Sequence, residues 1–115
     1  MKAVLQIEFS AGILEDREAI LRRAGCRVMS VLGCDEARAF DSVAHDVGVV
    51  VIGHGAMRED RQQLVSFFRG KIPDITIVCL LRYTDTPFRE ADFNLPADNP
   101  ALWETIVVQA SQCYH

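Results

Sequence analysis

The stretch that decides the fold is Val47-Gly48-Val49-Val50-Val51-Ile52-Gly53-His54-Gly55. It is almost wholly β-branched and ends at two glycines that flank a histidine. A strand exposed on one face alternates apolar and polar residues, and this one does not. We therefore predict that it lies in the centre of a parallel sheet, buried on both faces. Ligands of open parallel sheets bind just past the carboxyl ends of the central strands, so functional groups are sought first around Gly53-His54-Gly55.

Apolar runs on both sides of this stretch predict four further strands, at residues 2–9, 27–32, 75–81 and 92–95. Helical patterns lie between them: from Ser10 to about Ala24, a short helix capped by Asp35, about 58–69, and from Asn99-Pro100 to about Ser111. This alternation predicts right-handed βαβ crossovers in an α/β fold with helices on both faces of a parallel sheet. The runs at 2–9, 47–52 and 75–81 are the most apolar and take the central places. The predicted strand order is therefore 2-1-3-4-5, as in the doubly wound, flavodoxin-like (βα)5 fold.

Two segments carry further predictions, namely the first helix and residues 82–91. In the first helix, the periodicity places Ile13, Ile20 and Ala24 inward, and Arg17, Arg22 and Arg23 on a solvated face. The segment 82–91 is polar and contains Pro87, so the fourth of the five helices of such a fold is predicted to be shortened or missing. A loop or a single turn, more mobile than its surroundings, is expected there.

The composition bounds the class of protein. The length of 115 residues predicts a single domain over 1–115, large enough to bury a hydrophobic core without disulfide bonds or metal ions. The formal net charge of -4 argues against a nucleic-acid surface. No apolar run approaches the ~20 residues of a membrane span, and the first residues do not resemble a leader peptide. The four cysteines lack CxxC spacing, which predicts neither a zinc site nor a disulfide framework but reduced thiols in a cytoplasm: Cys26, Cys34, Cys79 and Cys113.

Four short motifs, in this order, resemble the receiver domain of two-component response regulators (CheY-like) over the whole chain. They are Ile20-Leu21-Arg22-Arg23-Ala24-Gly25, Asp35-Glu36-Ala37, Ile72-Pro73-Asp74 and Leu95-Pro96. These are scaffold features and carry no chemistry of their own. The resemblance implies the same five-stranded fold and a role in signalling.

Receivers accept a phosphoryl group on an aspartate that follows the third strand. The resemblance also implies two acidic residues after the first strand that hold magnesium, a hydroxyl after the fourth and a lysine after the fifth. Laid on this chain, these positions fall on Glu8 and Phe9, Gly53, Leu81 and Leu95. Only Glu8 keeps a suitable group. The chain is therefore interpreted as a degenerate receiver without phosphotransfer, with no catalytic residue, no metal and no cofactor.

Two shifted alignments would restore an acceptor. Asp46 precedes the central strand and so lies at the wrong end of it. Asp85 lies in the irregular segment and would lack the partners that the reaction needs.

The glycine loop offers other chemistry. Gly53-His54-Gly55 could present backbone amides to an anion, but it has neither the GxxxxGK spacing nor the GxGxxG fingerprint. His54 could act as a base or a ligand, yet a lone histidine has no evident partner, and a structural or solvent-facing role is the simpler interpretation.

The favoured function is a phosphorylation-independent protein-interaction module in signalling. The alternative is a domain that binds a small molecule or an anion above the first and third strands. The last helix is predicted to bury Leu102, Ile106, Ala110 and Cys113 and to expose Trp103, Val107 and Val108. Receivers commonly pair through the side of the fifth strand and last helix, so these exposed residues predict a protein partner or a homodimer there. The opposing hypothesis is that Trp103 and Val107 fold inward over the sheet.

Overall fold

In the computed structural model, which describes residues 1–112, five parallel strands form one sheet in the order β2-β1-β3-β4-β5. The strands are β1 Ala3–Glu8, β2 Val28–Leu32, β3 Val47–Ile52, β4 Thr76–Leu81 and β5 Phe93–Pro96. The helices are α1 Ala11–Arg23, α2 Gly33–Ala39, α3 Arg58–Lys71 and α4 Pro100–Ser111. The predicted α/β fold and strand order are confirmed.

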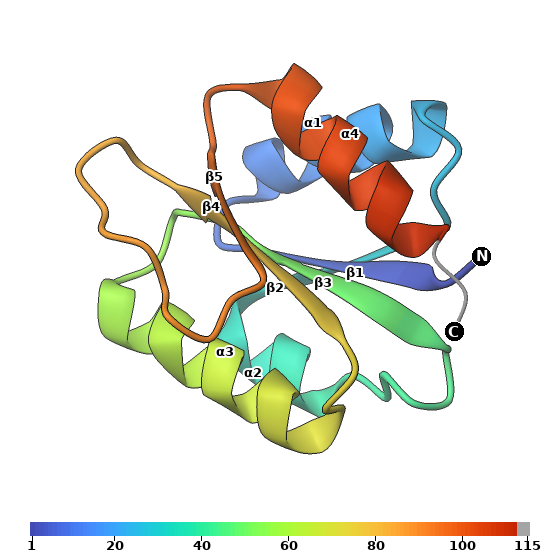
Figure 1. Cartoon of the computed structure of the whole chain (residues 1–115), viewed down its shortest axis with the longest axis horizontal. Helices are drawn as coiled ribbons and strands as arrows, with labels where there is room; N and C mark the ends of the chain where they lie inside the picture. Colours follow the sequence, from blue (N-terminus) through green and yellow to red (C-terminus); the bar gives the residue numbers. More distant parts are fainter. Residues whose placement is uncertain (113–115) are drawn as a thin grey trace.

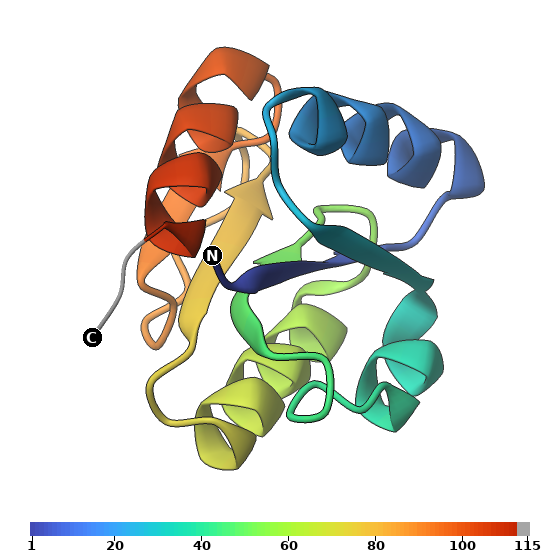
Figure 2. The same ribbon diagram turned by 90° about the vertical axis from the view of Figure 1, so that its right-hand side faces the viewer.

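The helices form two layers, with α1 and α4 on one face of the sheet and α2 and α3 on the other (Figures 1 and 2). Each face has its own buried cluster. Leu5 and Ile52 belong to the α2–α3 cluster, and Val51 and Leu80 to the α1–α4 cluster. Successive side chains of a strand point to opposite faces, so one continuous apolar run can supply both cores.

The most apolar runs do take the central places. All six residues of β1 are buried, and in β3 only Gly48 is partly exposed. The pairing register sets Val4 beside Val49 and Ile7 beside Ile52. Among residues 1–112, no helix has both the length and the apolar character that a membrane crossing requires.

Helix starts differ in detail from the prediction. Ser10 is the N-cap residue of α1, but its side chain makes no capping hydrogen bond. The second helix begins two residues before Asp35, because the Glu36 carboxylate accepts a hydrogen bond of 3.0 Å from the Leu32 amide. The predicted cap at Asn99 is confirmed, since its side chain accepts from the Leu102 amide at 3.3 Å.

The segment between β4 and β5 contains no helix, as predicted. Arginines of α3 hold it instead: Arg58 donates to the carbonyls of Thr86 and Pro87, at 2.6 and 3.0 Å. The Phe88 side chain is only 1% exposed and joins the core on the α2–α3 face. These hydrogen bonds tie two carbonyls of the loop to α3, and its predicted mobility stays a prediction.

The orientation of the last helix was predicted wrongly. Trp103 and Val107, expected on the surface, are 1% and 0% exposed, and Val108 packs partly buried beside them. Leu102, expected inside, is 38% exposed. Cys113 lies outside the described residues. The Trp103 indole Nε1 donates to the Ala97 carbonyl at 3.2 Å, so the large ring is both buried and hydrogen-bonded.

Candidate functional site

Glu8 and Gly53 meet at the carboxyl edge of the sheet. Glu8 is the last residue of β1, and Gly53 follows β3 and donates its amide to the Ile7 carbonyl at 2.9 Å. A Cβ built on Gly53 would lie 2.0 Å from Oε1 of Glu8 and 2.5 Å from its Cδ. The carboxyl group of Glu8 therefore fills the space in which any side chain at position 53 would begin.

Arg17 of α1 neutralises this carboxylate. Its NH1 group donates to Oε2 of Glu8 at 2.8 Å, and the two side chains are 10% and 1% exposed. The prediction that Arg17 faces water was wrong. A buried carboxylate needs a hydrogen-bonded cation, and Arg17 lies on the inward side of α1, where it supplies one.

His54 is the third member of this network. The NH2 group of Arg17 lies 3.1 Å from Nδ1 of His54. A guanidinium only donates hydrogen bonds, so Nδ1 must be the acceptor and the ring proton must be on Nε2. The His54 ring is therefore neutral, and the expectation that it lacks a partner was wrong.

The electrostatics agree with this assignment. Burial raises the pKa of Glu8, while the hydrogen bond and charge of Arg17 act in the opposite direction. Burial lowers the pKa of His54, and the nearby cations of Arg17, Arg82 and Arg61 lower it further. Arg17 also makes a cation–π contact with α4: its guanidinium carbon lies 5.9 Å from the centroid of the Trp103 ring.

The other residues at the receiver positions do not join the network. Phe9 packs against the cluster on the α2–α3 face, away from Glu8. Leu81 ends β4, and Leu95 pairs with Leu80 within the sheet and packs against the opposite cluster. Of the six residues predicted for this site, only Glu8 and His54 contact Arg17, and Gly53 lies against the Glu8 carboxyl group.

The site does not fit a magnesium ion. A divalent cation needs several oxygen ligands, and Glu8 is already bound to a cation, Arg17, while Phe9 offers no oxygen in its side chain. Within residues 1–112 no group of three or more histidine, cysteine or acidic side chains is placed to hold a metal.

Neither shifted alignment finds a free acceptor. Asp46 lies before β3, at the opposite end of the strand, and binds Lys2 at 2.9 Å. Asp85 accepts two hydrogen bonds from Arg61, at 2.9 and 3.0 Å, and a third from the Arg82 amide. The Arg61 hydrogen bonds lower the pKa of Asp85 to about 2. Both carboxylates thus serve structural ion pairs.

A pocket of about 300 Å³ opens beside this network, where β4 and β5 end. We call it the β4–β5 pocket. It is lined by Arg17, His54, Leu81, Arg82, Tyr83, Ala97 and Asp98. Sequence reasoning placed the candidate pocket above strands 1 and 3, but there the Glu8 side chain fills the space.

The chain has the fold of response-regulator receiver domains. At the carboxyl edge of its sheet it carries the buried Arg17–Glu8 ion pair. No family model matches the sequence, and no curated protein matches it.

Solved structures do match. The response regulator protein TrrA of Thermotoga maritima, in complex with Mg(2+)-BeF, is 18% identical, with a TM-score of 0.81 over 96% of this chain and 99% of that one. A receiver domain protein of Clostridium thermocellum is 15% identical, with a TM-score of 0.82 over 96% and 94%. A putative pilus assembly protein of Burkholderia thailandensis is 15% identical, with a TM-score of 0.81 over 98% and 100%. These TM-scores establish a shared fold.

Sequence reasoning missed the buried arginines, although a signal was present. Arg17 lies four residues before Leu21, and Arg61 lies three residues before Leu64. Each therefore falls within the apolar stripe of its helix, where a residue is more often buried than solvated.

Proposed function

We propose that this chain is a phosphorylation-independent, non-enzymatic signalling module of the cytoplasm that works by binding a protein partner. The observation that carries the proposal is the Glu8 carboxylate, which occupies the place beside Gly53 and is held there by Arg17 at 2.8 Å. A receiver-like fold in which this place is already filled and neutralised has no acceptor to modify. Its signal must then come from binding.

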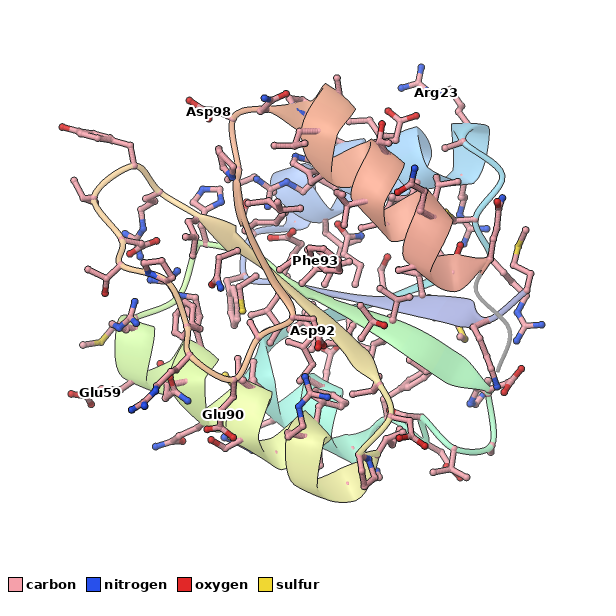
Figure 3. The ribbon with its side chains drawn as sticks, in the orientation of Figure 1. Arg23, Glu59, Glu90, Asp92, Phe93 and Asp98 are labelled. Atoms are coloured by element: carbon pink, nitrogen blue, oxygen red, sulfur yellow. The ribbon has the colours of Figure 1, made fainter. Side chains whose placement is uncertain are left out.

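The side formed by β5 and α4 is the proposed contact surface. β5 is an edge strand of four residues, all of them at least partly exposed. Phe93 and Leu102 are 37% and 38% exposed, and Ile106 is partly exposed on the same helix as Leu102. Figure 3 shows Phe93 on β5 on the viewer's side of the molecule, below α4. Leu102 and Phe93 replace Trp103, Val107 and Val108 as the residues that carry this proposal.

The absence of phosphotransfer is tested by intact-mass spectrometry. The chain is incubated with acetyl phosphate and Mg²⁺ beside an active receiver domain as a positive control. We expect no added phosphoryl mass on this chain under conditions that fully label the control. A stable phosphoryl group on any residue of the carboxyl edge of the sheet would refute the proposal.

The contact surface is tested with a matched pair of variants, starting from a second copy as the partner. Leu102→Lys places a charge on the proposed surface. Leu32→Lys places the same charge on a leucine of similar exposure, 40%, at the opposite edge of the sheet. Analytical ultracentrifugation over a dilution series should show a dimer for the wild type and for Leu32→Lys but a monomer for Leu102→Lys. A wild type that is monomeric throughout would exclude the second copy, and equal effects of both variants would contradict the surface.

A further inference from the structure

We propose that the β4–β5 pocket is a metal-free binding site for a small molecule that carries a carboxylate or a phosphate on an apolar, single-ring body. This site opens at the carboxyl end of β5, next to the proposed contact surface, and uses no receiver chemistry. Its oxyanion would be held by Arg17, His54 and Arg82, and its apolar part by Leu81, Ala97 and Tyr83.

The donors that face the pocket lack enough acceptors within the protein. A guanidinium has five N–H donors, and Arg17 uses one toward Glu8 and one toward His54. Within residues 1–112 its other donors have no protein acceptor. Because Nδ1 of His54 accepts from Arg17, its Nε2 carries the proton and is a further donor. An oxyanion would give these donors charged acceptors in place of water.

Arg82 brings a second cation to the same pocket. Its side chain is 48% exposed, and its NH2 group donates to the Ala56 carbonyl at 3.0 Å, which holds the guanidinium near the rim. Its Nε lies 3.8 Å from Asp85, but that carboxylate is already engaged by Arg61 at 2.9 Å. Arg82 therefore keeps charge and donors for a ligand.

The hydrogen-bond donors that line the pocket favour an anion. Arg17 is paired with Glu8, so this ion pair adds donors to the pocket but no net charge. Arg82 supplies the charge that attracts a ligand, and the exposed Asp98 opposes it. The pocket also adjoins the amino end of α4, which begins at Pro100 and adds a positive partial charge.

The size and walls of the pocket set the size of the ligand. Its volume of about 300 Å³ is at the lower end of known ligand sites. An adjoining hollow of about 240 Å³ shares Leu81, Arg82, Tyr83 and Asp98 with the pocket. It adds Asp85, Asn94 and Pro96, so the apolar part of a ligand rests on the Leu81, Ala97 and Tyr83 side. The Tyr83 ring is 98% exposed, so it lies free at the rim and can close over a bound ring.

The test is an amide chemical-shift titration of the whole chain with three probes that share a phenyl ring: phenyl phosphate, benzoate and benzyl alcohol. We expect both oxyanions to shift the amides of His54, Arg82, Tyr83 and Ala97, and the neutral alcohol to leave them unchanged. Whichever oxyanion binds more tightly identifies the natural headgroup as phosphate or carboxylate. Equal binding of the alcohol, or no shift at these amides with either oxyanion, would overturn the proposal.

Matched variants distinguish binding in this pocket from nonspecific attraction of anions to the protein surface. Arg82→Gln should weaken the tighter oxyanion about tenfold, the typical loss of one charge-assisted hydrogen bond. Arg23→Gln removes the same charge from the far end of α1, well away from Asp98 in Figure 3, and should have no effect. Asp98→Asn should tighten binding severalfold, whereas Glu59→Gln, on α3, should not. Equal weakening by Arg82→Gln and Arg23→Gln in folded variants would contradict a specific site.

Discussion

The carboxyl group of Glu8 occupies the space that a side chain at Gly53 would need, with 2.0 Å between Oε1 and an ideal Cβ. The glycine admits the Glu8 carboxylate to a buried position beside Arg17, so the absence of a side chain at position 53 and the buried ion pair depend on each other.

Gly53→Ala should destabilise the protein by about 2 kcal/mol, because the added methyl group overpacks a buried site. In a background that carries Glu8→Ala, the same substitution should cost much less, since the colliding carboxyl group is gone. Urea denaturation of the wild type, both single variants and the double variant gives the coupling energy. Strictly additive losses would show that the two residues do not compete for space. Gly53→Asp should be destabilised as well and should remain unphosphorylated.

Arg17→Met should lower the free energy of unfolding by about 3–5 kcal/mol at pH 7, the usual loss when a buried ion pair keeps one charge. Without Arg17 only burial acts strongly on Glu8, so its pKa rises further. The folded state then binds more protons than the unfolded chain between the two pKa values, and the deficit should shrink as the pH falls.

The control for this prediction is Arg23→Met, which removes an exposed arginine from the same helix and should be nearly neutral. Adding Glu8→Gln to Arg17→Met should recover part of the loss. A deficit that grows on acidification would contradict a buried, unpaired carboxylate as its cause.

Asp85→Asn should destabilise the loop between β4 and β5 in a pH-dependent manner. The Arg61 hydrogen bonds depress the pKa of Asp85 to about 2, below its value in the unfolded chain. The resulting stability is present above about pH 4 and is lost as the pH falls toward 2; this pH-dependent part is about 2 kcal/mol. Denaturation at pH 7, 4 and 2.5 should show wild type and variant converging in acid. Asp74→Asn, at an exposed aspartate, is the control, and parallel curves for Asp85→Asn would contradict the prediction.

Trp103, the single tryptophan of the chain, should report the core rather than an interface. Its emission should be blue-shifted, resistant to iodide quenching and unchanged on dilution. Trp103→Ala should lower the free energy of unfolding by about 3–5 kcal/mol, the usual loss for a large buried aromatic side chain. Leu102→Lys should stay within about 0.5 kcal/mol of the wild type because Leu102 is partly exposed. A red-shifted, readily quenched emission from the native protein would contradict the burial.

Much of the fold follows from the one-dimensional pattern. The uninterrupted run Val49–Ile52 belongs in a sheet buried on both faces, and the alternation of strands and helices leads to one strand order. Pro87 and the short polar segment around it exclude the helix that receivers place there, and Gly53 has no side chain to phosphorylate. Each of these conclusions depends on a residue type and its immediate neighbours, which are visible in the sequence.

The site was decided by contacts between distant segments. The spacing of Arg17 from Leu21 and of Arg61 from Leu64 is compatible with an inward position, but a cation stays buried there only if another element supplies an anion. Glu8 comes from β1, and Asp85 comes from the loop after β4, 24 residues beyond Arg61. The last helix is apolar on most sides, so its period does not choose between Leu102 and Trp103. Packing decides that Trp103 is buried: its large ring fills the space over the sheet beside Arg17, and its Nε1 donates to the Ala97 carbonyl. Residue types and their order are enough to set the scaffold and to put a glycine after the central strand, whereas tertiary contacts alone determined which charges and which helix face became buried.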